Sequence, residues 1–265
     1  MTLAAGYKFE HPKAAGVSPI LLLSDSRYSR GGEPNRDDGK KVWQLATNVF
    51  AVIAGDVLTA QRALATVKER LDASFRGSFE DVSVILRSSF ESHMMAGNPQ
   101  QPHCILASMA LDGSSKLFYA RPLAGRYEVT ERTSVVIGLV NLEPVLREKI
   151  EEPAARAGPW HPRHFMMHPD DVLRNDIDRR QQAIRDAWDI SFHVVSQFLL
   201  VVENPTVAGA NPPLQNVFLT PGRAQHMQLF QVGGIDQIAR RTAQTKEVSG
   251  VVDPLNGPIE ELTVW

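Results

Sequence analysis

The residues best suited to chemistry are a threonine near the start of the chain and three short segments that follow it. Thr2 comes directly after Met1, and later come Ser24-Asp25-Ser26-Arg27, the pair Lys40-Lys41, and Ala54-Gly55 where a helix is expected to begin. A threonine hydroxyl becomes a nucleophile when a base removes its proton, and a terminal α-amino group with a pKa of about 7.7–8.0 can be that base. A terminal threonine could therefore supply both groups.

The motifs of commoner hydrolase and nucleotide sites are absent from the sequence. There is no GxSxG, HExxH or GxGxxG segment, and Gly39-Lys40-Lys41 is not a phosphate-binding loop because neither Ser nor Thr follows the lysine. Thr2 and the segments that accompany it are therefore the strongest chemical signal in the chain.

These segments resemble the proteasome-type peptidases, which are N-terminal nucleophile (Ntn) hydrolases whose first mature residue is a threonine. In that family the opening strand is similar to Thr2–Phe9, and the next strand ends in a small residue followed by Asp-Ser-Arg. The family's catalytic lysine lies 16 positions after that aspartate and its oxyanion glycine 14 positions further on, which correspond to Lys41 and Gly55. A bacterial proteasome beta-subunit homologue is implied, with Thr2, Asp25, Lys41 and Gly55 as catalytic residues.

The residue types at these four positions suit such chemistry. A nearby Lys41 ammonium would disfavour protonation of the terminal amine and favour alkoxide character on the hydroxyl, and the Asp25 carboxylate would hold that ammonium in place and charged. The Gly55 N–H could donate to the oxyanion of a tetrahedral intermediate, where glycine allows close approach of substrate. Met1 must first be removed, and a small second residue such as Thr2 permits trimming by methionine aminopeptidase.

The same ungapped correspondence implies five substrate-binding positions. Arg27 matches the family's structural arginine beside the aspartate, and Ser29 matches the position whose backbone pairs with the extended substrate. Tyr28, Ile53 and Val57 fall where the family lines its first specificity pocket. Ile53 at the floor of that pocket predicts an apolar or small side chain on the acyl side of the cut bond.

The resemblance implies a threonine-type endopeptidase of a proteasome-like assembly, a homo-oligomer built as a ring or a helical stack. Its expected substrates are peptides or unfolded proteins, an ATPase unfoldase is a candidate partner, and no cofactor or metal is needed. Two alternatives remain open, a small-molecule Ntn amidase and a catalytically silent assembly protein. The silent alternative arises because Ile137-Gly138-Leu139 lacks the serine that normally follows the glycine and supports the active threonine.

Composition excludes several other classes of protein. The 265 residues include 28 Lys and Arg against 30 Asp and Glu, a net charge of -2 that leaves no positive excess for binding nucleic acid. The longest apolar runs, such as Val49–Ala54, are far shorter than the roughly 18–20 residues that cross a bilayer, so no membrane partner is expected. With no secretory signal and one cysteine, Cys104, a cytoplasmic location is expected.

Three histidines close together in the sequence are not expected to bind a metal. His161, His164 and His168 are interrupted by Pro162 and Pro169, which would break any helix that aligned them. We therefore predict no metal site there.

Hydrophobic periodicity and turn residues predict an α+β chain. The expected strands are 2–9, 20–24, 41–45, 48–54, 103–111, 115–120, 126–138 and 217–219. The expected helices are 57–71 with Asp56 as N-cap, 78–95 with a Ser78 capping box, a short one near 146–151, and 176–202.

The order of these elements and the resemblance together imply one fold. It is the Ntn-hydrolase fold, a four-layer αββα sandwich of two antiparallel sheets between helical layers. Residues 1–220 are expected to form the Ntn-hydrolase domain. Residues 221–265 would be a C-terminal extension that packs on the domain or on a neighbouring subunit.

Overall fold

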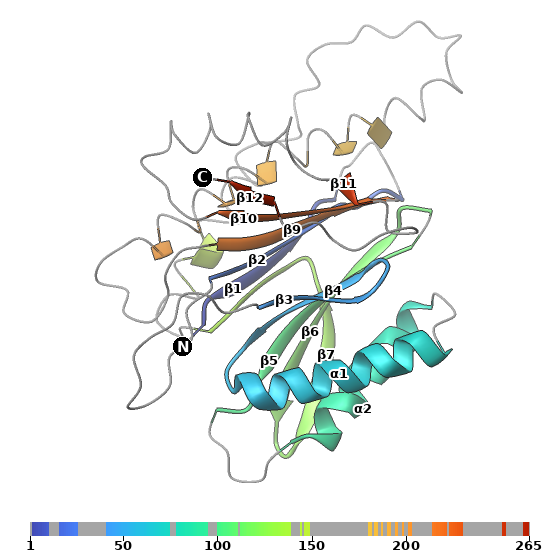
Figure 1. The fold of residues 1–265 in the computed structure, drawn as a ribbon, viewed down its shortest axis with the longest axis vertical. Helices are drawn as coiled ribbons and strands as arrows, with labels where there is room; N and C mark the ends of the chain where they lie inside the picture. Colours follow the sequence, from blue (N-terminus) through green and yellow to red (C-terminus); the bar gives the residue numbers. More distant parts are fainter. Residues whose placement is uncertain are drawn as a thin grey trace, which may run out of the picture.

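A computed structural model of the chain describes most of its first half and selected parts of its second half. The described residues are 2–10, 16–25, 41–74, 78–94, 100–110, 112–138, 144, 146–148, twelve helical positions between 180 and 202, 214–221, 223–229, 251–252 and 262–264. Two β-sheets are stacked face to face, and two helices cover the outer face of one of them (Figure 1).

The first sheet joins strands from both ends of the sequence. Its strands are β1 (Ala4–Lys8), β2 (Ile20–Asp25), β8 (Ser134–Ile137), β9 (Leu214–Thr220), β10 (Arg223–Leu229), β11 (Val251–Val252) and β12 (Leu262–Val264). They run in the order β11-β10-β9-β2-β1-β8, with β12 also paired to β10. The pairings are antiparallel except that between β10 and β12, which is parallel.

The second sheet is an antiparallel meander with its strands in sequence order. It contains β3 (Val42–Ala46), β4 (Val49–Ala54), β5 (His103–Met109), β6 (Ser115–Leu123) and β7 (Arg126–Arg132). A two-residue turn joins β6 to β7, with φ of 50° at Ala124 and 80° at Gly125. Such positive φ values at both central positions match the right-handed twist of the flanking strands.

Helices α1 (Val57–Ser74) and α2 (Phe79–Ser92) begin at the caps that the sequence predicts. The Asp56 carboxylate accepts a hydrogen bond from the Leu58 N–H at 3.1 Å, and the Ser78 hydroxyl accepts from the N–H groups of Glu80 and Asp81. Each cap satisfies backbone donors that the first helical turn leaves without a partner.

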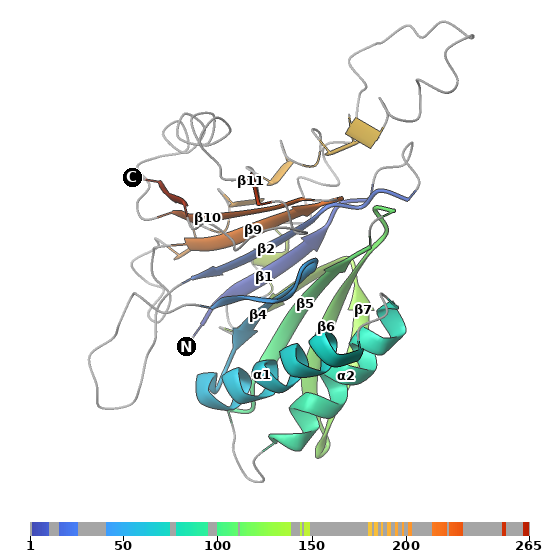
Figure 2. The same cartoon turned by 45° about the vertical axis from the view of Figure 1, so that its right-hand side comes forward.

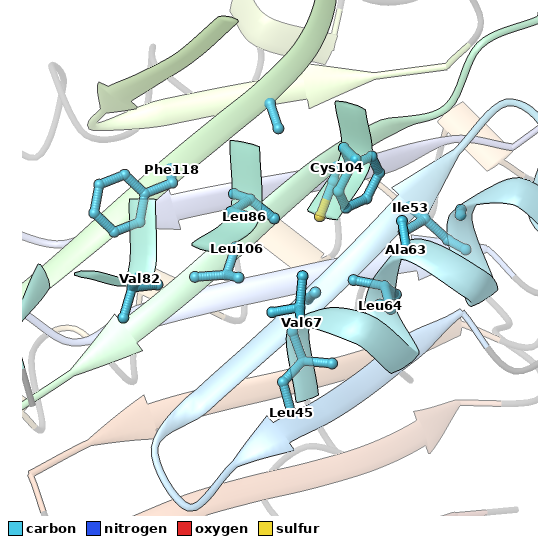
Figure 3. Packing of buried hydrophobic residues seen from close by; sticks show 14 of the residues in the cluster. Leu45, Ile53, Ala63, Leu64, Val67, Val82, Leu86, Cys104, Leu106 and Phe118 are labelled. Atoms are coloured by element: carbon cyan, nitrogen blue, oxygen red, sulfur yellow. The ribbon is translucent and has the colours of Figure 1, made fainter. Parts of the chain in front are cut away.

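Three apolar clusters hold the layers together. One fills the space between the two sheets and includes Ile20, Val52 and Val217. A second lies between the second sheet and the helices α1 and α2, which lie across that sheet in Figure 2, and Figure 3 shows part of this cluster. The third packs the other face of the first sheet against helical residues such as Val194 and Phe198. Both sheets are therefore buried on two faces over much of their area.

The predicted α+β class with two antiparallel sheets is confirmed, apart from the parallel β12. One predicted element is wrong, because residues 126–138 are not a single strand. The chain leaves the second sheet after Arg132 and enters the first at Ser134, and between them the Thr133 carbonyl accepts a hydrogen bond from the Lys8 N–H at 2.8 Å. Residues 126–137 contain no Pro or Gly that would mark a break in the strand. The point where the chain crosses from one sheet to the other is therefore set by strand pairing alone.

In the second half of the chain, the described parts of both predicted helices are helical, namely 144 and 146–148 and the described positions between 180 and 202. The predicted strand 217–219 is the middle of the longer β9. The proposed boundary at residue 220 falls between β9 and β10, which pair along their whole length.

Two further predictions concern the chain as a whole. Among the described helices, none has the length and apolar character to span a membrane. His161, His164 and His168 lie outside the described residues. Within the described part of the chain, no three His, Cys, Asp or Glu side chains are grouped as metal ligands.

Candidate active site

An ion pair between Asp25 and Lys41 forms the centre of the candidate site. Asp25 is the last residue of β2, and Lys41 directly precedes β3 in the other sheet. The Lys41 Nζ donates to Asp25 Oδ1 at 3.0 Å, and both side chains are 0% exposed. A buried ion pair is costly to desolvate and is retained only when good geometry and further hydrogen bonds compensate.

The same carboxylate oxygen holds the residue that follows Thr2. The Leu3 N–H donates to Asp25 Oδ1 at 2.9 Å, and the Asp25 N–H donates to the Leu3 carbonyl at 3.0 Å. These bonds continue the β1–β2 register, in which Ala4 pairs with Ser24, by one step towards the chain start. Thr2 is 4% exposed and directly precedes the residue that Asp25 binds.

Gly138 confines Thr2 from the other side. It directly follows β8, and a Cβ built on it would lie 1.7 Å from the Thr2 carbonyl oxygen. Its φ of +120° is also a backbone conformation that residues other than glycine rarely adopt. The sequence analysis noted Gly138 only for the serine missing after it. Its close approach to Thr2 has no local sequence signal, because the two residues flank different strands that are far apart in the sequence.

Gln215 is a second residue of the site that sequence reasoning missed. It lies on β9 and pairs with Ser24 of β2. The residue before it, Leu214, pairs with Asp25. The Gln215 Oε1 accepts hydrogen bonds from the Lys41 N–H at 2.9 Å and the Val42 N–H at 3.2 Å. A contact across 174 residues leaves no periodicity by which it could be found.

Gly55 lies at the turn from β4 into α1, with a φ of +97°. It is exposed, and a Cβ there would lie 2.8 Å from the Gln101 carbonyl oxygen. The next amide, the Asp56 N–H, donates to the Gln100 carbonyl at 2.9 Å. Because β3 begins where antiparallel β4 ends, Lys41 and Gly55 lie at the same end of the second sheet.

The residues predicted to bind substrate are only partly described. Ile53 is 1% exposed and packs in the cluster between the second sheet and α1 and α2, beside Ala63 (Figure 3). Val57, at the start of α1, packs against the same cluster and is partly buried. The remaining three, Arg27, Tyr28 and Ser29, lie outside the described residues.

Two titratable groups near the end of β4 have altered proton affinity. His103, which pairs with Ala54, makes a 2.8 Å hydrogen bond through Nδ1 with the Tyr119 hydroxyl. Burial, and secondarily the charge of Arg121, lowers the pKa of the His103 imidazole. The adjacent Cys104 is fully buried in the helix-side cluster, and burial raises the pKa of its thiol. Cys104 is therefore a packing residue rather than a nucleophile.

The site thus combines Thr2, Asp25 and Lys41 in one buried group and adds Gly138 and Gln215 to it. Such an arrangement holds the Lys41 ammonium on the carboxylate that also binds the residue after Thr2. No protein-family model matches the sequence, and no curated protein matches it. Inferences about function therefore depend on these contacts.

Proposed function

We propose that the chain is a threonine-type endopeptidase, a protease of a proteasome-like assembly, whose nucleophile is Thr2 after loss of Met1. The observation that carries the proposal is the double role of Asp25 Oδ1, which accepts from both the Lys41 ammonium at 3.0 Å and the Leu3 N–H at 2.9 Å. A buried cation and the residue next to the proposed nucleophile thereby share one carboxylate oxygen. The charge of that cation would favour the free amine and the alkoxide form of the hydroxyl.

The proposed reaction proceeds in two stages. In the first, the Thr2 amine takes the hydroxyl proton while Oγ1 attacks the scissile carbonyl, and the Gly55 N–H donates to the oxyanion. The amine returns the proton to the leaving peptide nitrogen as the C–N bond breaks, which leaves an ester on Thr2. In the second stage, the amine takes a proton from water as the water oxygen attacks the ester carbonyl. The protonated amine returns that proton to Oγ1 as the C–O bond to Thr2 breaks, which releases the carboxylic product and restores the hydroxyl.

The arrangement of the layers supports the same proposal. Two stacked sheets carry α1 and α2 on one outer face, and helical residues between 183 and 202 pack on the other. We propose that this is the four-layer αββα sandwich of Ntn hydrolases. In such a sandwich the strand ends at one edge bring an N-terminal residue, a carboxylate and a lysine together.

We further propose that the chain works in the cytoplasm as a homo-oligomer, a ring or a helical stack, in which the sites face an enclosed space. Enclosure would restrict the substrates to peptides and unfolded proteins. An ATPase unfoldase would then be the partner that supplies unfolded chains.

The test compares three proteins purified from a bacterial host, namely wild type, Thr2→Ala and the matched control Thr133→Ala. Thr133 is an exposed threonine at the crossing between the sheets, so its loss should leave activity unchanged. We expect the wild type to lack Met1 by intact mass, to cleave fluorogenic peptides, and to form an adduct on Thr2 with an epoxyketone that reacts with both hydroxyl and amine. Thr2→Ala should lose cleavage and labelling.

Three results would refute the peptidase proposal. Full activity in Thr2→Ala would remove Thr2 from the mechanism. Labelling of Thr2 with hydrolysis of compact acyl amides but not of peptides would indicate the amidase. Assembly of the wild type without labelling or cleavage would indicate the silent protein.

A further inference from the structure

Gln215 contacts the backbone of the lysine whose side chain Asp25 holds. Its Oε1 accepts from the N–H groups of Lys41 and Val42, at 2.9 and 3.2 Å, and its side chain is almost fully buried at 4% exposed. Gln215 belongs to the first sheet, whereas Val42 opens the second. The contact therefore fixes the start of β3 against the opposite sheet.

The two acceptors that hold Lys41 come from adjacent strands. In the β2–β9 register, Ser24 pairs with Gln215 and Asp25 pairs with Leu214. Asp25 binds the ammonium, and Gln215 binds the main chain of the same lysine. A lysine side chain is a flexible four-carbon stem, so the position of its charge depends on where its own backbone is held as well as on the partner of Nζ.

β3 also needs an anchor because it is the edge strand of its sheet. In the described strands it pairs with β4 on one side only. A buried backbone N–H group without an acceptor lowers stability, and the Gln215 oxygen accepts from two such amides at once. Loss of that oxygen would let the start of β3 shift and would carry Lys41 with it.

We propose that Gln215 is a positioning residue that sets the place of the Lys41 ammonium relative to Thr2. This inference rests on the proposed function, because it assigns Gln215 a role in the same reaction. In this role Gln215 acts through the Lys41 backbone rather than on the substrate. A misplacement of about 1 Å in a catalytic group can cost roughly 100-fold in rate, so a substantial fall in kcat is expected without it.

The experiment uses Gln215→Met, which keeps the length of the side chain but removes the acceptor, and Gln215→Glu, which keeps an acceptor oxygen. The matched control is Asn216→Leu. Asn216 is the next residue on β9, is 0% exposed, and has no hydrogen-bond partner for its amide within the described structure. Each full-length variant is assayed for peptide kcat and KM, for epoxyketone labelling, and for amide exchange at Lys41 and Val42.

We expect Gln215→Met to lower kcat and the labelling rate roughly 10- to 100-fold with little change in KM, and to speed exchange at both amides. Gln215→Glu should recover most of the lost rate, and Asn216→Leu should match wild type. Equal kcat in Gln215→Met and wild type would overturn the inference, as would a loss explained entirely by a smaller folded fraction.

Amide exchange separates failure of this inference from failure of the proposed function. If wild type neither cleaves peptides nor reacts with the probe, the peptidase proposal fails. Exchange at Lys41 and Val42 then decides by itself whether Gln215 holds the lysine backbone. Unchanged exchange in Gln215→Met would overturn that contact as well.

Discussion

Replacement of Gly138 by alanine should displace Thr2 and so separate site geometry from general stability. The Thr2 carbonyl oxygen lies 1.7 Å from where the new Cβ would be, whereas real Cβ contacts are essentially never under 3.0 Å. The contact must therefore lengthen by more than about 1 Å, a shift that can cost roughly 100-fold in rate. The φ of +120° adds backbone strain of about 1–3 kcal/mol.

The matched control is Gly125→Ala. Gly125 also has a positive φ, +80°, but a Cβ there meets nothing within 4 Å. It should lose only about 1–2 kcal/mol of unfolding free energy and keep the wild-type labelling rate, because only the left-handed conformation is penalised. Unfolding free energies come from urea denaturation, and the Thr2 labelling rate comes from mass spectrometry with the epoxyketone.

Gly138→Ala should lose more stability than Gly125→Ala and should label far more slowly at temperatures where both variants are folded. Equal stability losses and equal labelling rates in the two variants would refute the reasoning. They would mean that Gly138 does not confine Thr2.

Three other predictions use the buried titratable groups. Lys41→Met should lower the free energy of unfolding, measured by urea denaturation, by about 3–5 kcal/mol, because it leaves the buried Asp25 carboxylate without its cation. Adding Asp25→Asn should restore part of that loss. Additive losses in the double variant would contradict the pairing. Cys104, the only cysteine, should resist a thiol reagent in the folded protein and react fully in urea, since it is buried and its thiol pKa is raised; fast reaction when folded would contradict its burial. Burial lowers the pKa of the His103 imidazole, so the unfolded chain binds a proton at this residue more readily than the folded chain does. The contribution of His103 to stability is therefore present above about pH 6.5 and declines as the pH falls below it. The decline is at most about 1.4 kcal/mol per pH unit. His103→Gln should flatten that part of the stability profile, and an unchanged profile would show that His103 is not its source.

Local patterns in the sequence predicted the elements whose causes are themselves local. Strands β1 and β2 follow from two apolar runs separated by turn residues, and the caps at Asp56 and Ser78 follow from side chains that bond to nearby amides. Asp25 and Lys41, identified from a family resemblance within one stretch, lie together as that resemblance requires. Roles in catalysis remain predictions.

The missed features depend on contacts between distant parts of the chain. Gln215 is an ordinary polar residue in a strand until β9 pairs with β2 and brings it to Lys41. Gly138 resembles any glycine after a strand until β8 pairs with β1 beside Thr2. The crossing near Thr133 and the strands beyond residue 220 likewise depend on which partner each strand meets, which periodicity does not specify.

The place of β9 in the sequence has a consequence for synthesis of the protein. Lys41 leaves the ribosome 174 residues before Gln215, the residue of β9 that completes the surroundings of this lysine. A nascent chain lacking β9 cannot form the Gln215 bonds to β3 or the β2–β9 pairing. Since long-range pairings form late in folding, the surroundings of Lys41 are completed only after residues 214–220 have been made.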